Sequence, residues 1–445
     1  MNAKFFDMGF NEIGGKVFFN EGLFSKYFHT LYKIINCNNK LFIYEDNFWR
    51  HVEEIELKKL CKSCFDNIEI GVWRLNYENK YIPTIKTDAV LIEEKMLNRY
   101  QYKINFQNGV YNFKTQKFEE HCEENYFSYI MDYELLGDRA LTPHFDMLMD
   151  TLSNGDKELE LFLLRFMAYL VSGIKTEQKF YILKSSGNSG KSTFINLISK
   201  LINEKFTANI PINKLDDRFS IAEAVGKKLI VAAENEGMGK FKISTETLKT
   251  VSGGDLVRIE RKYENSYSDK INVELLFATN SDNLLFDELS EGLKRRMTII
   301  ETEGRVKEHI IDFQEKLEAE IPPIMTKLIS SFKDIVNNGY KLPLCQSVID
   351  ASSNAINRGV VDKIGDEFYS FFQENLEFEE GTKVTKSQIY KLYEQNGGKE
   401  STSKFWKRFD LWVEYRKNKI ERTSPPNRGI VGVKLIKDIN LEDII

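Results

Sequence analysis

The chain has 445 residues, of which 42% are hydrophobic and 29% are charged, as in a globular protein of two to four domains. No apolar run approaches the ~20 residues of a membrane span, and residues 1–15 lack the basic and apolar blocks of a secretory signal, so we expect a cytoplasmic protein without a membrane partner. The net charge of −5 does not indicate a nucleic-acid binder, which makes the local distribution of charge more informative than the total.

Residues 1–145 mix short aromatic strands and helices, and we expect them to form an α+β domain. Residues 41–44 and 48–50 are expected to pair as strands about a turn, and the Asn-Gly pair within residues 107–112 indicates a second turn. The paired metal-binding carboxylates of a primase polymerase site are not evident. A structural or protein-contact role is therefore the better interpretation of this part.

The five cysteines are scattered, which is typical of a reducing compartment. Cys61 and Cys64 form the only close pair and lie in EIELKKLCKSCF, which we interpret as a helix with two ordinary cysteines. A zinc site completed by His121 and Cys122 is the alternative, but no second CxxC pair supports it.

Residues 146–178 are predicted to be a helical linker or collar. They contain DKELELFLLRFMAYLVSGI, in which apolar residues recur at helical spacing. A buried helix is therefore expected directly before the next motif.

The segment FYILKSSGNSGKSTF, residues 180–194, contains the most informative motif of the chain. An apolar run of strand length is followed by a loop of small residues, then by Gly-Lys-Ser at the start of an amphipathic helix. This order is the architecture of a phosphate-binding P-loop. Small residues let backbone N–H groups surround phosphate oxygens, and the helix start adds its positive dipole end.

We expect this loop to bind ATP with Mg²⁺. Lys191 would reach the β- and γ-phosphates, and the Ser192 hydroxyl would ligate the metal. Ser185 stands where the usual pattern has its first glycine, and a chance Gly-Lys-Ser at a helix start is the alternative. The predicted nucleotide-binding residues are Ser186, Gly187, Asn188, Ser189, Gly190, Lys191, Ser192 and Thr193.

Residues 227–236, KKLIVAAENE, indicate a buried parallel strand that ends in acids. The carboxyl end of such a strand would lie beside the P-loop. Glu234 is placed to hold Mg²⁺ through water and to polarise the attacking water, and Glu236 could share that role. A plain strand end with solvated acids is the alternative.

Residues 250–280 predict a β-hairpin that leads into another buried strand, LLFATN. Positive charge and an aromatic ring on a hairpin suit single-stranded nucleic acid, because charges track phosphates and rings stack on bases. A solvated hairpin is the alternative. The predicted DNA-binding residues here are Arg258, Arg261, Lys262, Tyr263 and Lys270.

Two further catalytic candidates follow this hairpin. Asn280 ends the second strand, where it could position the lytic water or sense the γ-phosphate. Arg295 and Arg296 precede the apolar run MTII, and an arginine at that place can reach a neighbouring subunit's ATP as an arginine finger. A surface basic cluster is the alternative.

The C-terminal part, residues 360–445, has a different character. We expect three helices, DKIGDEFYSFFQENLEF, residues 384–395 and residues 401–415, followed by a two-stranded wing around Pro-Pro-Asn-Arg-Gly. Such a winged helix-turn-helix would read duplex DNA with its third helix, and protein docking is the alternative. The predicted contacts are Lys404, Lys407, Arg408, Arg416, Lys419 and Arg428.

The motif order SGNSGKST, LIVAAENE, SGGDLVRIERKY, LLFATN and LKRRM resembles superfamily 3 replicative helicases. The closest likeness is to the phage and plasmid "primase C-terminal" branch, related to poxvirus helicase-primases, and INFQNGVYNFKTQKFEEH resembles the N-terminal domain of that branch. The likeness spans about residues 60–300, with a weaker match in the C-terminal part.

The resemblance implies an α/β AAA+ core over residues 179–345, with a parallel sheet covered by helices on both faces. It also implies a hexameric ring that moves 3′ to 5′ on one DNA strand. Lys191 and Ser192 match the Walker A residues, Glu234 the Walker B acid and Asn280 sensor 1. Arg296, which directly precedes the apolar strand, matches the finger better than Arg295. Lys262 and Tyr263 match the pair at the hairpin tip that grips DNA, where relatives often have His in place of Tyr.

From these features we expect an initiator-helicase of a mobile element, such as a pathogenicity island or chromosomal cassette. Its partners would be single-stranded DNA in the ring, duplex origin DNA at the C-terminal part, its own copies and host replication proteins. A DNA-binding ATPase switch or loader is the alternative function. A helicase-primase is a third, and because the chain shows no N-terminal primase domain we expect no primer synthesis.

Overall fold

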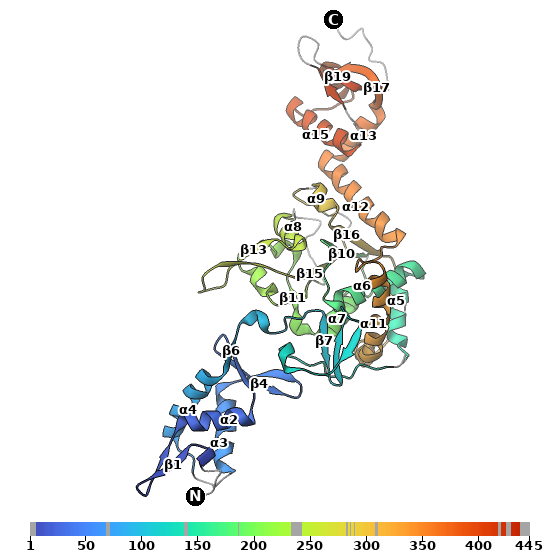
Figure 1. Ribbon diagram of the computed structural model, residues 1–445. Helices are drawn as coiled ribbons and strands as arrows, with labels where there is room; N and C mark the ends of the chain where they lie inside the picture. The colour runs from blue at the N-terminus through green and yellow to red at the C-terminus, as the bar shows by residue number, and fades with distance from the viewer. Residues whose placement is uncertain are drawn as a thin grey trace.

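The computed structural model describes residues 6–67, 72–137, 141–185, 187–232, 243–281, 284, 286–288, 290–307, 310–416, 420–423 and 429–436. Figure 1 shows an N-terminal unit at the bottom, a central unit built on a sheet, and a C-terminal module at the top. The fold is mixed α/β with a parallel sheet, as the sequence predicts. Within the described ranges, no helix has both the length and the apolar character needed to cross a membrane.

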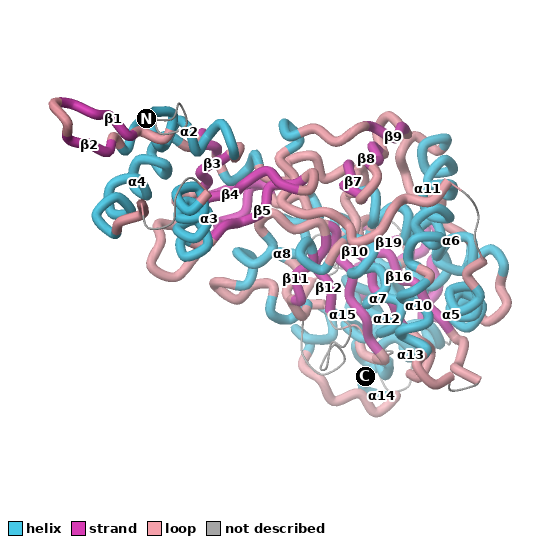
Figure 2. The backbone as a smooth tube through the Cα atoms, turned by 90° about the horizontal axis from the view of Figure 1, so that it is seen from below, coloured by secondary structure: helices cyan, strands magenta, loops and turns pink. Residues whose placement is uncertain are grey.

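The N-terminal unit packs three helices on a four-stranded sheet of order β5-β4-β3-β6. Figure 2 shows these helices beside strands β3 to β5. The expected strand pair is confirmed, because Leu41 of β4 lies opposite Val52 of β5 in antiparallel register. Its elements are β1 (Phe10–Ile13), β2 (Lys16–Phe19), α2 (Glu21–Leu31), β3 (Ile34–Cys37), β4 (Lys40–Glu45), β5 (Phe48–Val52), α3 (Glu54–Asp66), α4 (Leu75–Asp88) and β6 (Val90–Ile92).

Cys61 and Cys64 lie on helix α3, as predicted, and both are buried free thiols in the core of this unit. Burial raises the pKa of Cys64 to about 11, which keeps its thiol protonated at neutral pH. Across the described residues, no cluster of His, Cys, Asp and Glu could hold a metal ion. The pair is therefore part of the packing of α3.

The strands β7 (Lys103–Phe106), β8 (Gly109–Asn112) and β9 (Lys117–Glu119) belong to the central unit, since Ile104 and Phe106 are part of its core. The expected turn is present, with Gln107 and Asn108 as its two loop residues. Gly109 has φ +150°, and a Cβ there would lie 2.6 Å from the Phe118 ring. Residues 1–145 therefore do not share a single core, because those from Ile104 onward are buried with the central unit.

The central sheet has five parallel strands in the order β11-β12-β15-β10-β16. The amphipathic helix predicted after Gly190 is α7 (Lys191–Ile202). β10 leads through α7 to β11 at one edge of the sheet, and β15 leads to β16 at the other edge. The connections that follow these two neighbouring strands therefore leave in opposite directions. The strands are β10 (Phe180–Ser185), β11 (Thr207–Asn209), β12 (Leu229–Ala232), β15 (Glu274–Thr279) and β16 (Met297–Thr302).

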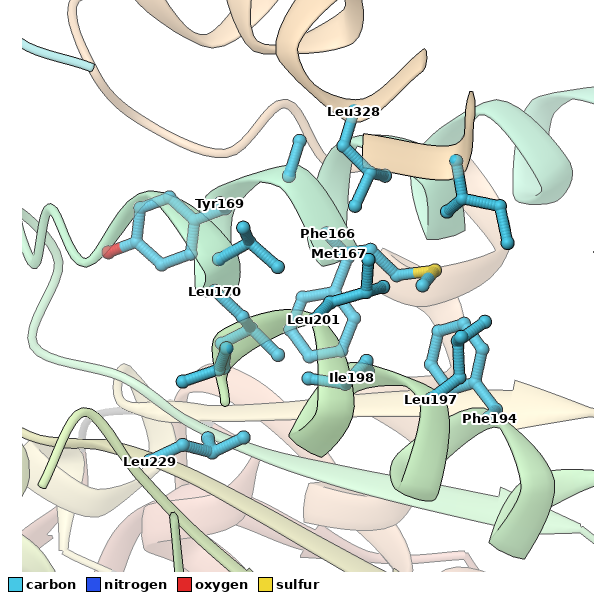
Figure 3. Packing of buried hydrophobic residues seen from close by; sticks show 14 of the residues in the cluster. Phe166, Met167, Tyr169, Leu170, Phe194, Leu197, Ile198, Leu201, Leu229 and Leu328 are labelled. Atoms are coloured by element: carbon cyan, nitrogen blue, oxygen red, sulfur yellow. The ribbon is translucent and has the colours of Figure 1, made fainter. Parts of the chain in front are cut away.

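Helices cover both faces of this sheet. One face packs on α5 (Pro143–Ser153), α6 (Lys157–Ser172), α7 and α11 (Ile321–Asn337), and the predicted buried helix is α6. The other face packs on α8 (Glu246–Gly253) and on the base of the hairpin β13 (Leu256–Ile259) and β14 (Tyr267–Lys270). Figure 3 shows the first core, with the labelled side chains Phe166, Met167, Tyr169, Leu170, Phe194, Leu197, Ile198, Leu201, Leu229 and Leu328.

Helix α12 (Gln346–Ile364) joins the central unit to the C-terminal module. It packs on β16, where the Ser352 hydroxyl accepts from the Ile299 N–H at 2.9 Å, and its end enters the core of the module. The single helix expected around residues 362–378 is wrong. The chain breaks at Gly365, whose φ of +91° ends α12 before α13 (Asp366–Asn375) begins.

The module contains α13, α14 (Lys386–Gln395), α15 (Thr402–Tyr415) and a three-stranded antiparallel sheet of order β17-β19-β18. Its strands are β17 (Leu376–Thr385), β18 (Glu421–Arg422) and β19 (Gly429–Leu435). Helix α14 begins with a capping box between Thr385 and Gln388. The module thus has one more strand than the sequence suggested, because β17 precedes the second helix.

Candidate functional site

The loop between β10 and α7 has a backbone suited to an anion. Gly187, Asn188 and Gly190 have φ of +94°, +48° and +86°, a conformation that turns backbone N–H groups into a concave surface. The positive φ of Gly190 favours glycine, and a Cβ there would lie 2.9 Å from Leu148 Cδ1, so that the leucine side chain would have to shift. Gly190 is the N-cap of α7, which places the positive end of the helix dipole at the loop. Ser186 lies outside the described residues.

Lys191 lies over this loop. Its ammonium donates to the Ser185 hydroxyl and, at 2.5 Å, to Asn280 Oδ1. Ser185 also exchanges a hydrogen bond of 2.7 Å with Ser189, and both serines are buried. The departure from glycine at position 185 therefore has a physical reason, since β10 is still extended there and the hydroxyl holds the lysine.

The contact of Lys191 with Asn280 joins the carboxyl ends of β10 and β15. These strands are parallel neighbours, with Lys184 opposite Thr279, so the loop and Asn280 meet at one edge of the sheet. Ligands of open α/β sheets bind at that edge, where strand connections leave in opposite directions. Ser192 is exposed and Thr193 half-buried in the first turn of α7, the position from which a hydroxyl can reach a metal bound to phosphates.

The expected acid-bearing strand is β12, which is buried and parallel to β15 and β11. Ala232 lies opposite Phe277, so its carboxyl end points to the same edge as the loop. Glu234 and Glu236 lie outside the described residues.

Arg296 directly precedes β16 and lies at the opposite edge of the sheet from the loop. Its carbonyl accepts from the N–H of Phe180, the first residue of β10. The guanidinium is half-buried, whereas the Arg295 side chain is exposed. The structure therefore does not bring Arg296 to Lys191 within one chain.

The hairpin β13–β14 projects from the central unit (Figure 1), with Arg258 opposite Ser268 in antiparallel register. Tyr263 is 104% exposed and has φ +66°, and Lys262 and Lys270 are exposed as well. Arg261 is half-buried and forms a long ion pair of 3.9 Å with Glu94. The five predicted residues thus lie on one projecting element, and Tyr263 at its turn is fully accessible.

Two residues that sequence reasoning missed, Arg218 and Phe219, lie beside this hairpin. The Lys262 ammonium is 6.0 Å from the centre of the Phe219 ring, and Glu260 pairs with both Arg218 and Arg258. Phe219 is 38% exposed, which leaves part of its ring available for stacking. The only sequence signal is the Arg-Phe pair in a polar stretch, and that signal is weak.

The basic residues of α15 differ in their surroundings. Lys404, Lys407 and Arg416 are exposed, but Arg408 donates to the Ile364 carbonyl and its guanidinium lies 4.6 Å from the Phe368 ring centre. Arg408 therefore connects α15 to the end of α12, which departs from its expected place on a DNA-facing surface. Lys419 and Arg428 lie outside the described residues.

Comparisons with known proteins place similarity on two segments. Residues 26–154 match the family described as "D5 N terminal like", and residues 183–296 match a family of unknown function, DUF5906. The chain is 25% identical over 176 residues to "Putative helicase L207/L206" of Acanthamoeba polyphaga mimivirus. That match covers 38% of this chain and 18% of the viral protein, so the chain corresponds to less than a fifth of that relative.

The fold has solved counterparts. The apo structure of the NrS-1 C terminal region (305–718) is similar with a TM-score of 0.55 and 12% identity, covering 93% of this chain and all of that one. The A form apo structure of the same region has a TM-score of 0.54 at 12% identity and covers 92% of this chain and 98% of that one. The whole arrangement of units therefore recurs in another protein, and the sequence matches support a helicase-like family for this chain.

Proposed function

We propose that the chain is an ATP-dependent DNA helicase and replication initiator of a mobile genetic element, built on a superfamily 3 AAA+ core. The observation that carries the proposal is the contact of Lys191 with Asn280 over the loop at the carboxyl edge of the sheet. It joins a phosphate-binding lysine to a polar side chain on a neighbouring strand, as γ-phosphate hydrolysis needs.

The residues at the loop fit ATP and Mg²⁺. The positive-φ backbone, the start of α7 and the Lys191 ammonium would bind phosphates, and the exposed Ser192 hydroxyl would be a ligand of Mg²⁺. Bound Mg²⁺ would neutralise charge on the β- and γ-phosphates. Asn280 would orient the attacking water, with Glu234 as the proposed acid beside it.

The hairpin and its neighbours supply the proposed path for single-stranded DNA. Lys262 and Arg258 offer charges for phosphates, and Tyr263 and Phe219 offer exposed rings for bases. A homo-hexameric ring, with Arg296 completing the neighbour's ATP site, would place six such hairpins around one strand, moving 3′ to 5′.

The C-terminal module is proposed to be a winged helix that selects the duplex origin. Its three helices and its antiparallel sheet support this assignment, and α15 would enter the major groove with Lys404 and Lys407. Arg416 would contact the backbone beside it, as would Lys419 and Arg428 of the proposed wing.

The decisive experiment is strand displacement on forked DNA with either a 3′ or a 5′ single-stranded tail, in ATP and Mg²⁺. We expect unwinding from the 3′ tail only, and none with Lys191→Ala, whose C-terminal module should still bind DNA. DNA-stimulated hydrolysis without displacement would contradict the motor and favour an ATPase switch or loader. Hydrolysis by Lys191→Ala at the wild-type rate would contradict the nucleotide site itself.

A further inference from the structure

The loop of residues 173–179, between α6 and β10, contacts both the region of the hairpin β13–β14 and Arg296. In the proposed function the hairpin binds DNA and Arg296 serves ATP hydrolysis. It lies at the edge of the sheet opposite the nucleotide loop, where β10 begins. From there its side chains reach the root of the hairpin β13–β14 and the guanidinium of Arg296.

Gln178 makes both contacts with one side chain. Its Nε2 donates to the Gly253 carbonyl at 3.1 Å, and its Oε1 accepts from Arg296 Nη2 at 3.5 Å, the outer limit of a hydrogen bond. Gly253 ends α8, three residues before β13. An amide suits this place because it carries an acceptor and donors on one rigid group.

The Arg296 guanidinium is packed on the same glycine. A Cβ at Gly253 would lie 3.2 Å from Arg296 Nη2, which is closer than most side chains tolerate. The Nε of Arg296 is buried and has no hydrogen-bond partner among the described residues. The Asp255 carboxylate also lies at this glycine, with Oδ2 2.9 Å from the same Cβ position, but among the described residues it forms no ion pair with Arg296. The guanidinium is therefore held by Gln178 and by its contact with Gly253.

Lys175 joins the two segments that flank the hairpin. Its ammonium donates to the Val251 carbonyl of α8 at 3.0 Å, and to the Val273 carbonyl, between β14 and β15, at 2.8 Å. Burial lowers the pKa of Lys175, and the nearby Glu274 opposes this shift. The helix that ends at Gly253 is therefore linked through Lys175 to the segment that follows the hairpin.

We propose that Gln178 is a positioning residue that couples Arg296 to the root of the DNA-contacting hairpin. The inference rests on the proposed function, in which Arg296 reaches the ATP of a neighbouring subunit. When the guanidinium moves toward that ATP, the long contact to Gln178 breaks, and the hold on Gly253 changes with it. Such small shifts become larger motions where packed elements have two arrangements.

The test measures ATP hydrolysis with and without single-stranded DNA for the wild type, Gln178→Ala and Gln178→Glu. The side chain of Gln178 is exposed, so both variants should fold, and equal melting temperatures would verify this. Glutamate keeps the size of the side chain but cannot donate to the Gly253 carbonyl. We expect the ratio of DNA-stimulated to basal hydrolysis to fall at least about fivefold in both variants, the lower end of usual coupling between sites. Gln346→Ala, an exposed glutamine on α12, should keep the wild-type ratio.

The outcomes separate this inference from the proposed function. If single-stranded DNA does not change the rate of ATP hydrolysis by the wild type, the proposed motor function is contradicted, and the proposed coupling with it. If DNA stimulates hydrolysis by the wild type, and both Gln178 variants keep the ratio of DNA-stimulated to basal hydrolysis within about twofold of the wild-type ratio, the proposed coupling alone is contradicted. Recovery in Gln178→Glu but not in Gln178→Ala would also overturn it. The carboxylate still accepts from Arg296 but cannot donate to the Gly253 carbonyl, so the link to the hairpin root would then not be needed.

Discussion

At the residue scale, the central unit contains a buried acid at the start of β15. Glu274, the first residue of β15, is 4% exposed, and neither of its carboxyl oxygens has a hydrogen-bond partner among the described residues. Burial raises the pKa of Glu274 to about 7, although the Lys175 ammonium opposes the shift. The folded state therefore holds a proton that the unfolded chain releases at lower pH.

This gives a testable pH dependence. Between the usual glutamate pKa of 4.5 and about 7, folded Glu274 keeps its proton while the unfolded chain loses it, so the free energy of unfolding falls as pH rises through this window. Glu274→Gln stays neutral and should escape this loss. We expect the variant to gain stability relative to the wild type, by an amount on the order of 3 kcal/mol, between about pH 4.5 and pH 8.

Urea unfolding at several pH values would measure the difference. Glu264→Gln, which makes the same change at an exposed position of the hairpin turn, is the matched control. A Glu274→Gln difference that does not vary with pH would show that this carboxyl group titrates in the folded state as it does in the unfolded chain.

At the scale of elements, the hairpin β13–β14 and the segment that carries Phe219 form one surface. Lys262→Ala and Phe219→Ala should each abolish strand displacement while hydrolysis of ATP persists, because the hairpin is a sheet of its own, separate from the one that carries the Lys191 loop, and the two side chains face each other. Removal of one base-stacking ring costs about 1–3 kcal/mol of binding in single-strand binders.

Displacement and ATPase assays on the same preparations would check this prediction. Lys117→Ala, which removes an exposed lysine from β9, serves as the control. Full displacement activity in Lys262→Ala would place the DNA path elsewhere.

The junction of α12 and α13 is a second feature at this scale. Gly365 has φ +91°, and a Cβ there would lie 2.6 Å from the Arg408 Nη1 atom that also serves the Ile364 carbonyl. Gly365→Ala should therefore destabilise the C-terminal module by about 1–3 kcal/mol, through backbone strain and the displaced guanidinium.

Limited proteolysis of the whole chain, followed over time, would report opening of that module. Gly381→Ala is a matched control, since Gly381 has φ +79° but no heavy atom within 4 Å of the added Cβ. If the two variants are cleaved at the same rate, the contact with Arg408 contributes nothing beyond strain.

At the scale of the whole molecule, the position of Arg296 determines how it can act. Phe180 lies opposite Met297 and Ser185 opposite Thr302, so the length of the strand β10 separates Arg296 from the loop before α7. Six residues at ~3.3 Å each place the two roughly 20 Å apart. Under the proposed function, Arg296 would therefore serve the ATP site of another copy of the chain.

Mixing of subunits tests this placement. Arg296→Ala alone and Lys191→Ala alone should both lack ATPase activity, the first through a missing finger and the second through a missing phosphate contact. Mixed assemblies should recover part of the activity, because an intact finger then faces an intact loop in some interfaces. Activity that stays absent at every mixing ratio would contradict a role for Arg296 between subunits.

Local patterns in the sequence determined the glycine-containing loop between β10 and α7, the buried strands and most helices. Those features depend on residues near one another in the chain, such as the small residues before α7 or the apolar spacing of α6. The same holds for the Asn280 position, because a strand that ends in a polar residue is visible in the sequence. The break at Gly365 was missed because an isolated glycine within a helical pattern is an ambiguous signal.

Only the tertiary structure decided which distant residues meet. Phe219 is 43 positions before Lys262, and Gln178 is 118 positions before Arg296, and no periodicity relates either pair. Residues 103–119 joined the central core instead of the N-terminal one because their apolar side chains had to be buried against α6 and α11, which the local pattern does not specify. These contacts are fixed by the packing of helices and strands against one another, and that packing depends on residues from the whole chain.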